Sequence, residues 1–403
     1  MSFTFRLSSR LANIKPSVTL AVTARAARLR AEGIDVIGFG AGEPDFDTPV
    51  HIKDAAKRAL DAGQTKYTDV GGTPTLRKAI CKEMERAHGL HFAPEQVLVS
   101  CGAKHSLFNV FHALLDPGDE VIVPAPYWVS YPDIVKLAGG TPVVIETRAE
   151  DGFLVTPAQL HRAITSRTRA FILCSPSNPT GGAYDEAALS ALRPIFEEHG
   201  VMVVSDDIYR RLAYGDYRFK EIATLSPAMA ERTVIVDGFS KTYAMTGWRL
   251  GYTVGPRSLI QAMATLQGQS TSNPTSIAQA AAVAALEGPE EPIEEMRREF
   301  DRRRQVMVKK LRAIPGVSCY DPRGAFYCFP DVSAYVDRRP KGGEVIGDDA
   351  RLSEYLLDVG RVAVVPGSGF GAPGFVRLSY ATSMENVSKG IDRMAEALAA
   401  LET

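Results

Sequence analysis

The chain has 403 residues, of which 45% are hydrophobic and 23% are charged, and its formal net charge is −1. This composition is typical of a globular enzyme, and the near-zero charge gives no field that would favour nucleic acid or an acidic membrane surface. Because the sequence has no apolar run of about 18 residues, we expect no membrane-spanning helix. The five cysteines contain no CxxC pair, so we expect no metal site, reduced thiols and a cytoplasmic location.

The first predicted elements are a helix over residues 15–31, which Gly33 would end, and a short strand over residues 35–39. The loop that follows contains Gly40, Ala41 and Gly42. Its small residues either let the backbone approach a ligand closely or simply form a tight turn. A helix is expected over residues 51–62, with Tyr67 in the loop after it.

From about residue 95, short apolar strands alternate with helical segments. The strands are predicted at residues 97–99, 120–123, 170–174, 201–204 and 234–236. This alternation is typical of a mostly parallel sheet that is covered by helices on both faces. In such sheets a ligand lies beyond the carboxyl ends of the strands, and each predicted strand is followed there by a cluster of polar or small residues.

After Pro315-Gly316 the pattern changes and predicts a second, smaller α/β domain. Residues 256–312 are expected to be largely helical. Strands are then expected at 324–329, 361–365 and 375–380, and a closing helix at 384–402. The predicted organisation is an N-terminal arm and part of the small domain in residues 1–48, a large cofactor-binding domain in 49–312, and the C-terminal part of the small domain in 313–403.

Lys241 is the residue on which the functional prediction depends. It follows a predicted buried strand, from which a lysine reaches a ligand at the carboxyl edge of the sheet. Burial and neighbouring cations would lower the pKa of its amine and free it for Schiff-base chemistry. Arg249, in the same stretch, is suited to bind a phosphate through its planar guanidinium group. Taken alone, each residue is also typical of a solvated surface, so the other clusters must support the prediction.

Those clusters supply the remaining requirements of a pyridoxal phosphate site. A carboxylate at the pyridine nitrogen makes the ring a better electron sink, and Asp206 fits this role, with Asp207 as the alternative. Tyr209 and Asn178 are suitable partners for the ring oxygen. Trp128 either stacks on the ring or packs in the core.

Two further clusters would hold anionic groups. Gly102-Ala103 opens a predicted helix directly after a strand, where backbone amides bind phosphate, and Ser240 and Arg249 would complete that site. Arg377, in an otherwise apolar strand, is the candidate for a two-bonded contact with a substrate carboxylate. An isolated strand arginine is also common on surfaces, so this assignment depends on the whole set.

Taken together, these motifs resemble those of the fold-type I aminotransferases, in the class I group that contains aspartate aminotransferases. The resemblance extends over essentially the whole chain. The motifs that carry it are AGEPDFDTP at 41–49, SPSNPTGG at 175–182, SDDIY at 205–209, FSKTYAMTGWRLGY at 239–252 and RLSYATS at 377–383.

The resemblance implies an enzyme that depends on pyridoxal phosphate and acts on amino acids and 2-oxo acids. Lys241 would carry the Schiff base and then move the proton between the substrate Cα and the cofactor. Asp206 and Tyr209 would bind the ring, and Trp128 would stack on it.

It also implies how the substrate is held and how the chains assemble. Asn178, Arg377 and the amide of Gly42 would hold the α-carboxylate. The family is dimeric, and Tyr67 is expected to reach the phosphate in the partner subunit. The bond between Asn178 and Pro179 is expected to be cis.

Within the group, the chain resembles a bacterial aspartate or aspartate/prephenate branch with KPSxT near the N-terminus and a lysine after the phosphate loop. Ser17, Thr19 and Lys104 fit this pattern and imply aspartate and glutamate as substrates. Lys15 is a candidate contact for the additional carboxylate of prephenate. One departure is SDD, where SDE is commoner, and we expect it to be harmless. The other is Gly71-Gly72-Thr73-Pro74, and this one leaves the use of prephenate open.

Several alternatives remain at this stage. An aromatic or alanine aminotransferase, or a β-eliminating lyase, would use the same scaffold. Lys104 argues against these, because an apolar side-chain pocket would leave its charge unpaired. A transcription regulator with a degenerate aminotransferase-like domain would need a DNA-binding module, for which the segment before Lys15 has no room.

Overall fold

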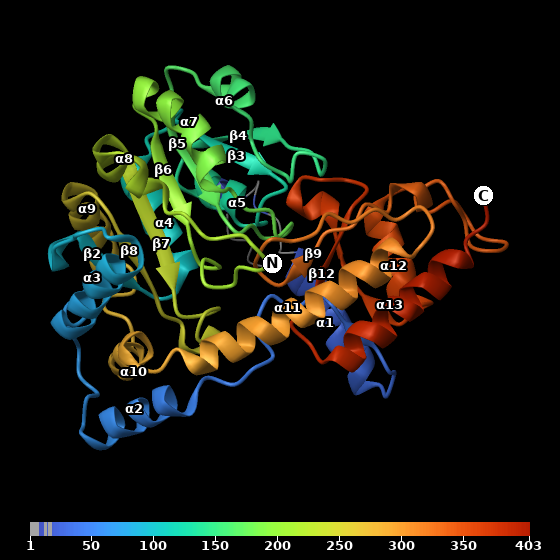
Figure 1. The fold of residues 1–403 in the computed structure, drawn as a ribbon, viewed down its shortest axis with the longest axis horizontal. Helices are drawn as coiled ribbons and strands as arrows, with labels where there is room; N and C mark the ends of the chain where they lie inside the picture. Colours follow the sequence, from blue (N-terminus) through green and yellow to red (C-terminus); the bar gives the residue numbers. More distant parts are fainter. Residues whose placement is uncertain (1–7, 12–13, 15–17) are drawn as a thin grey trace, which may run out of the picture.

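The computed structural model describes residues 8–11, 14 and 18–403. The predicted contacts of Lys15 and Ser17 therefore lie outside the described residues. Figure 1 shows a larger lobe built on a twisted sheet and a smaller lobe around α12 and α13, with the long helix α11 running between them.

A mostly parallel sheet forms the centre of the larger lobe. In the described part of the chain its strand order is β2-β8-β7-β6-β5-β3-β4, and β8 alone runs antiparallel to its neighbours. The strands are β2 (Val97–Ser100), β3 (Glu120–Ala125), β4 (Thr141–Glu146), β5 (Thr168–Cys174), β6 (Met202–Asp206), β7 (Thr233–Gly238) and β8 (Gly251–Val254). The predicted α/β class with a mostly parallel sheet is confirmed.

Helices cover both faces of this sheet. In β5, Ala170 and Ile172 pack with residues of α4, α5 and α9, whereas Phe171 and Leu173 pack with residues of α7 and α8. Successive strand side chains point to opposite faces, so a continuous apolar strand needs a cover on each side. The helices of this lobe are α2 (Val50–Asp61), α3 (Pro74–His88), α4 (Ala103–Leu114), α5 (Tyr131–Leu137), α6 (Pro157–Ala163), α7 (Glu186–His199), α8 (Pro227–Arg232), α9 (Arg257–Gly268) and α10 (Ser276–Glu287).

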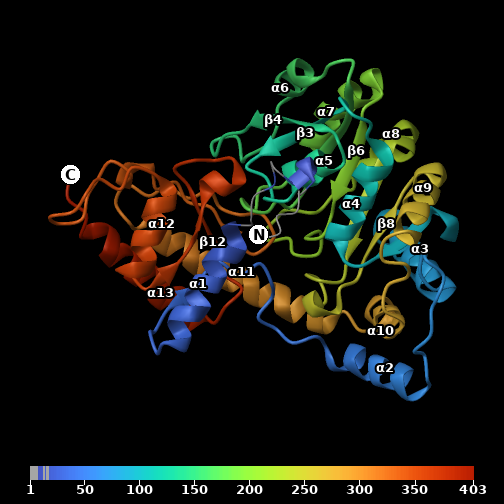
Figure 2. The same ribbon diagram turned by 180° about the vertical axis from the view of Figure 1, so that it is seen from behind.

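Segments from both ends of the chain form the smaller lobe. Figure 2 shows α1 in the same lobe as α12 and α13, where α1 packs against β1, β10 and β11 and β1 pairs in parallel with β10. A second, antiparallel sheet has the order β11-β12-β9. The elements are α1 (Val18–Ala31), β1 (Ile37–Gly38), α11 (Glu291–Arg312), β9 (Tyr327–Cys328), α12 (Asp349–Asp358), β10 (Val362–Ala363), β11 (Val365–Pro366), β12 (Val376–Ser379) and α13 (Met384–Ala399).

Helix α11 contributes buried side chains to both lobes. Ile293 packs in a core of the larger lobe, whereas Phe300, Met307 and Leu311 belong to the core of the smaller one. The domain boundaries given above, including the one at residue 312, stay a prediction. Among the described helices, none is long and apolar enough to cross a membrane.

Candidate active site

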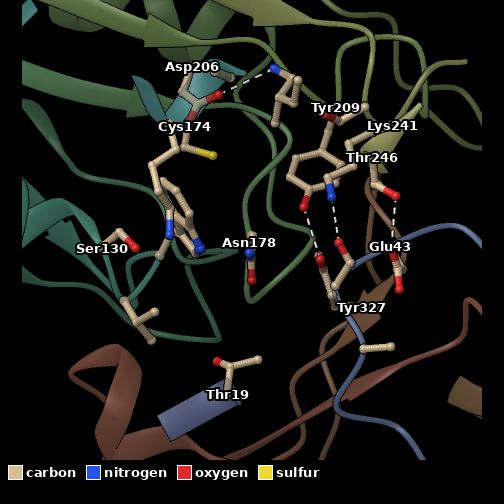
Figure 3. Close-up of a pocket in the computed structure, with 18 of the residues that line it drawn as sticks. Thr19, Glu43, Ser130, Cys174, Asn178, Asp206, Tyr209, Lys241, Thr246 and Tyr327 are labelled. Carbon is tan, nitrogen blue, oxygen red and sulfur yellow. Dashed lines mark hydrogen bonds between the residues drawn. The ribbon is translucent and has the colours of Figure 1, made fainter. Parts of the chain in front are cut away.

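A cavity of about 450 Å³ lies at the carboxyl ends of the central strands and is lined by residues of both lobes (Figure 3). It brings together most of the side chains that the sequence analysis selected. Those that line it are Thr19, Gly42, Ala103, Lys104, Trp128, Asn178, Asp206, Tyr209, Ser240, Lys241, Arg249 and Arg377. Tyr67 does not line it and is 92% exposed.

Lys241 follows the end of β7, and its ammonium group points into the cavity, where Nζ donates a hydrogen bond to the carbonyl of Gly42. Burial lowers the pKa of Lys241 to about 8; Glu43 opposes this shift, while Arg377 and Arg249 add to it. At pH 7 about a tenth of the amine is therefore unprotonated, compared with fewer than about one part in a thousand at the ordinary lysine pKa, and this fraction can act as a nucleophile.

Asp206 is the last residue of β6 and faces the cavity, whereas its neighbour Asp207 does not line it. Burial raises the pKa of the Asp206 carboxyl to about 6, and two hydrogen bonds oppose the shift. The hydroxyl of Tyr131 donates to Oδ2 at 2.6 Å, and the amide of Ile208 donates to Oδ1 at 3.4 Å. Sequence reasoning missed Tyr131. The one signal for it was its position at the start of a helix, shortly after Trp128.

Tyr209 is buried, and its hydroxyl lies 2.9 Å from the hydroxyl of Tyr327 on β9. The ring of Tyr327 lies against Arg377, with the guanidinium carbon 4.5 Å from the ring centre. Tyr327 therefore connects a ring-binding candidate of the large sheet to the carboxylate-binding candidate of the small one. Tyr327 was predicted to lie in a strand, and no role was predicted for it.

Arg377 is 2% exposed and lies in β12. Its two terminal nitrogens donate at 2.9 Å to the side-chain oxygen of Asn178 and to the carbonyl of Gly40. Its Nε has no partner among the described residues, although it is buried. A guanidinium at the cavity wall with an unused N–H is suited to bind a carboxylate. The bond between Asn178 and Pro179 is cis, as the resemblance implied.

The beginning of α4 forms a cradle for an anion. Gly102, with φ of +91°, precedes the helix, and a Cβ atom there would lie 2.8 Å from Nη2 of Arg249. A Cβ at Gly251, the first residue of β8, would lie 2.4 Å from the amide nitrogen of Ala103. Both glycines thus let Arg249 and the helix N-terminus approach each other closely. A helix N-terminus and a guanidinium group together attract phosphate.

Lys104, in the first turn of α4, lines the cavity. Its Nζ is 4.8 Å from the centre of the Trp128 ring, a cation–π contact. Burial, with a smaller effect of Arg249, lowers the pKa of Lys104. Thr19, at the start of α1, lines the same cavity from the other lobe (Figure 3). Lys104 and Thr19 therefore lie at one site, as the sequence pattern predicts.

A lysine and an aspartate at neighbouring strand ends, with an anion cradle beside them, define a class of enzyme that binds a phosphorylated cofactor with an aldehyde. Residues 34–394 match the model of the aminotransferase class I and II family, and the chain belongs to this family. It is therefore an aminotransferase of a family that depends on pyridoxal phosphate.

Curated relatives are similar over nearly their whole length. The chain is 50% identical to the aspartate aminotransferase of Geobacillus stearothermophilus, over 96% of this chain and 98% of the relative. It is 52% identical to the aspartate/prephenate aminotransferase of Cereibacter sphaeroides, over 96% and 97% of the two chains.

Solved structures agree with this relationship. The aspartate aminotransferase of Rhizobium meliloti superposes with a TM-score of 0.96 at 47% identity, covering 99% of this chain and all of that chain. The Thermus thermophilus aspartate aminotransferase with maleate superposes with a TM-score of 0.92 at 45% identity, covering 98% of this chain and all of that one.

Proposed function

We propose that this aminotransferase moves the amino group of aspartate or glutamate to a 2-oxo acid, with pyridoxal phosphate as its cofactor. The observation that carries the proposal is the cavity that joins Lys241, Asp206 and the unpaired Nε of Arg377. It offers a reactive amine, a carboxylate and a carboxylate-binding group at one place. The names of the relatives at about half identity support the same activity.

The side chains of the cavity fit this cofactor. Gly102 has no side chain, and a Cβ there would meet Arg249 in the cradle. Without that Cβ, Arg249, the backbone amides at the start of α4 and Ser240 would hold a phosphate there. Asp206 would hold the protonated pyridine nitrogen, Tyr209 and Asn178 the ring oxygen, and Trp128 the ring face. Pyridoxal phosphate supplies, when bound, an aldehyde for the substrate amine and a ring that withdraws electrons.

The residues of this chain would then act on the substrate as follows. Arg377, with Asn178 and the Gly42 amide, binds the α-carboxylate and so fixes the direction of the Cα–H bond. Lys241 accepts the Cα proton on Nζ, a task for which a pKa near neutrality is suitable. Asp206 keeps the proton on the pyridine nitrogen.

We infer the preference for a dicarboxylic substrate from Lys104 and Thr19, which both line the cavity. Lys104 carries a positive charge without an acidic partner among the described ion pairs, and the distal carboxylate would provide one. The Thermus thermophilus aspartate aminotransferase, which has the same fold, was solved with maleate, a dicarboxylate.

A second candidate substrate is prephenate, for an arogenate-forming reaction. The observation that favours it is the 52% identity to an aspartate/prephenate aminotransferase. Lys15 would contact the additional carboxylate, although it lies outside the described residues.

We propose further that the enzyme is a cytoplasmic homodimer. Tyr67 is 92% exposed, and Val50 and Leu60 on α2 are also exposed, so a partner subunit would cover apolar surface near this loop. Tyr67 would then reach the phosphate of the partner. The free cysteines of the described residues are consistent with a reducing compartment.

The test is the visible absorption spectrum of the purified protein with pyridoxal phosphate, before and after aspartate is added. The expected result is the band of a lysine-bound cofactor that aspartate converts to that of pyridoxamine phosphate. Prephenate added to the converted enzyme should restore the first band if it is an acceptor. A band that aspartate leaves unchanged would remove the aspartate assignment, and no band would remove the role of Lys241.

A further inference from the structure

Asp207 is a buried acid that the proposed reaction does not use. It is 0% exposed, and its side chain leaves β6 on the side opposite to Asp206 because strand side chains alternate. Its Oδ1 accepts a hydrogen bond of 2.6 Å from the hydroxyl of Ser205.

Glu221 is the side chain that Asp207 meets. It is 1% exposed and precedes the short 3₁₀ helix η3 (Ile222–Leu225), where its Oε1 accepts from the amide of Ala223 at 3.1 Å. Glu221 raises the pKa of Asp207, so the two buried carboxyl groups lie close enough to interact. The two remaining oxygens, Oδ2 of Asp207 and Oε2 of Glu221, are buried and have no other partner among the described residues.

Two ionised carboxylates can only accept hydrogen bonds, so this contact would be repulsive without a proton. A single proton between Oδ2 and Oε2 satisfies both atoms at once. Two carboxyl groups that share a buried site hold a proton for this reason.

The surroundings do not supply a positive charge in place of the proton. Within residues 18–403, no lysine or arginine forms an ion pair with Asp207 or Glu221. Arg210, in the same loop, donates at 2.7 Å to both Glu83 and Asp237. Lys220, next to Glu221 in the chain, pairs with Glu186 at 3.1 Å. The other titratable groups that interact with Asp207 are acidic or uncharged: Cys174 from β5, Asp237 from β7 and Tyr217 from the loop after β6. Burial raises the pKa of Asp207 well above its usual range, and Glu221 raises it further.

We propose that Asp207 and Glu221 share one proton, and that this pair is a positioning element which leaves Asp206 as the charged carboxylate at the end of β6. The second part rests on the proposed function, because Asp206 needs its charge only to hold a protonated pyridine ring. A full negative charge on Asp207 would stand next to Asp206 and raise the pKa of the latter. Asp206 would then take up a proton and lose its attraction for the ring.

Two amide variants separate this role from simple packing. In D207N the amide can still accept from Ser205 and can donate to Glu221, so the negative charge stays on residue 221. In E221Q the amide still accepts from Ala223 and donates to Asp207, so the charge moves to residue 207, beside Asp206. D216N is the matched control, because Asp216 is exposed in the same loop.

The first measurement is the infrared spectrum of the cofactor-free proteins at neutral pH. The C=O stretch of a protonated carboxyl group is expected in the wild type and in D216N, and its loss is expected in both D207N and E221Q. Absence of this band from the wild type would overturn the shared proton. If the wild type lacked the band and its stability depended on Na⁺ or K⁺, a bound cation would take the place of the proton. That result would also overturn the shared proton.

The second measurement is the affinity of each cofactor-free protein for pyridoxal phosphate. At pH 5, a rise of about one pKa unit on Asp206 should weaken binding in E221Q roughly ninefold, whereas D207N and D216N should stay within about twofold of the wild type. The double variant D207N/E221Q should recover the affinity that E221Q loses. Equal losses of affinity in D207N and E221Q would overturn the positioning role, because a packing defect from an amide would be similar at the two positions.

Failure of the proposed function gives a different result. If no protein bound the cofactor while the infrared band was present, the shared proton would stand and the role toward Asp206 would fall with the proposed function.

If E221Q did not fold, the pH dependence of the free energy of unfolding would be measured in place of cofactor affinity. Because Asp207 has a raised pKa, wild-type stability should fall as pH rises above the ordinary carboxyl pKa of about 4, and D207N should lack that part of the fall. The same slope in both proteins would overturn the proposal.

Discussion

Replacing Tyr131 by Phe removes one hydroxyl group and keeps the ring that packs edge-on against Trp128, at 5.4 Å between ring centres. The lost group is the donor of the 2.6 Å hydrogen bond to Oδ2 of Asp206. Because this bond stabilises the ionised form of a buried carboxyl, its loss should raise the pKa of Asp206 above the value of about 6 in the wild type.

The size of the effect follows from the worth of a hydrogen bond to a charged group, about 1.5–3 kcal/mol, which corresponds to about one to two pKa units. With a shift of about 1.5 units, the ionised fraction of Asp206 at pH 7 would fall from about 0.9 to about 0.25. If the cofactor binds only the ionised form, its affinity would fall about fourfold at pH 7 and about fifteenfold at pH 6. Near pH 9 the difference should vanish.

The assay is the dissociation constant of pyridoxal phosphate for the cofactor-free protein, measured from pH 6 to pH 9. Tyr127→Phe is the matched control, since it removes a neighbouring hydroxyl that is not bonded to Asp206. A loss of affinity that was the same at pH 6 and pH 9 would show that Tyr131 acts through packing, and no loss at any pH would refute the argument on Asp206.

The pH dependence of the free energy of unfolding gives a second readout. The cofactor-free wild type should lose about 3 kcal/mol as pH rises from about 4 to about 6, since folded Asp206 keeps a proton that the unfolded carboxyl has released. In Tyr131→Phe this loss should extend to higher pH.

The remaining predictions concern the reactive amine, the phosphate cradle and the distal carboxylate. Lys241→Ala should lose the band of the covalently attached cofactor and nearly all turnover; a variant that kept both would remove the assignment. In the wild type, the rate of cofactor attachment should rise with pH and level off above about 8, the pKa of Lys241, in stopped-flow absorbance. Gly102→Ala should cost about 1–2 kcal/mol in the free energy of unfolding, because of its positive φ, and should weaken phosphate binding, because the new Cβ meets Arg249; an unchanged affinity for inorganic phosphate would contradict the cradle. Lys104→Ala should lower kcat/KM for aspartate roughly tenfold and leave kcat/KM for alanine unchanged. Equal losses for both substrates would show that Lys104 serves the cofactor or the fold.

Much of the fold could be predicted because the central strands are apolar on both faces. The strands at 170–174, 201–204 and 234–236 correspond to β5, β6 and β7, whose burial leaves a continuous signal in the sequence. β4 was not predicted, since this edge strand is partly exposed and includes a proline at residue 142. β8 was also missed, because its four residues directly follow the lysine motif, are all buried and show no alternation of polar and apolar side chains.

Candidate site residues could be predicted where the chemistry of a side chain suits one particular part of the cofactor or substrate. A lysine, an aspartate and an arginine at strand ends are unusual enough to select, and the cavity joins Lys241, Asp206 and Arg377. Tyr131 and Tyr327 were missed because each acts on another side chain and not on a ligand. Their hydroxyl groups meet Asp206 and Tyr209 across 75 and 118 residues of sequence, and only the folded chain shows those pairs.

The arrangement of these contacts separates cofactor from substrate. The candidates for binding the ring and phosphate, from Gly102 to Arg249, come from the ends of one sheet, which the core of the larger lobe fixes. The candidates for the substrate carboxylate are divided: Arg377 belongs to β12, and Asn178 follows β5 in the other lobe. The hydrogen bond between them, and that between Tyr209 and Tyr327, therefore cross between the lobes. A carboxylate that bound to Nε of Arg377 would add to this link, so substrate binding should favour close contact of the lobes, whereas within one subunit the larger lobe would hold the cofactor.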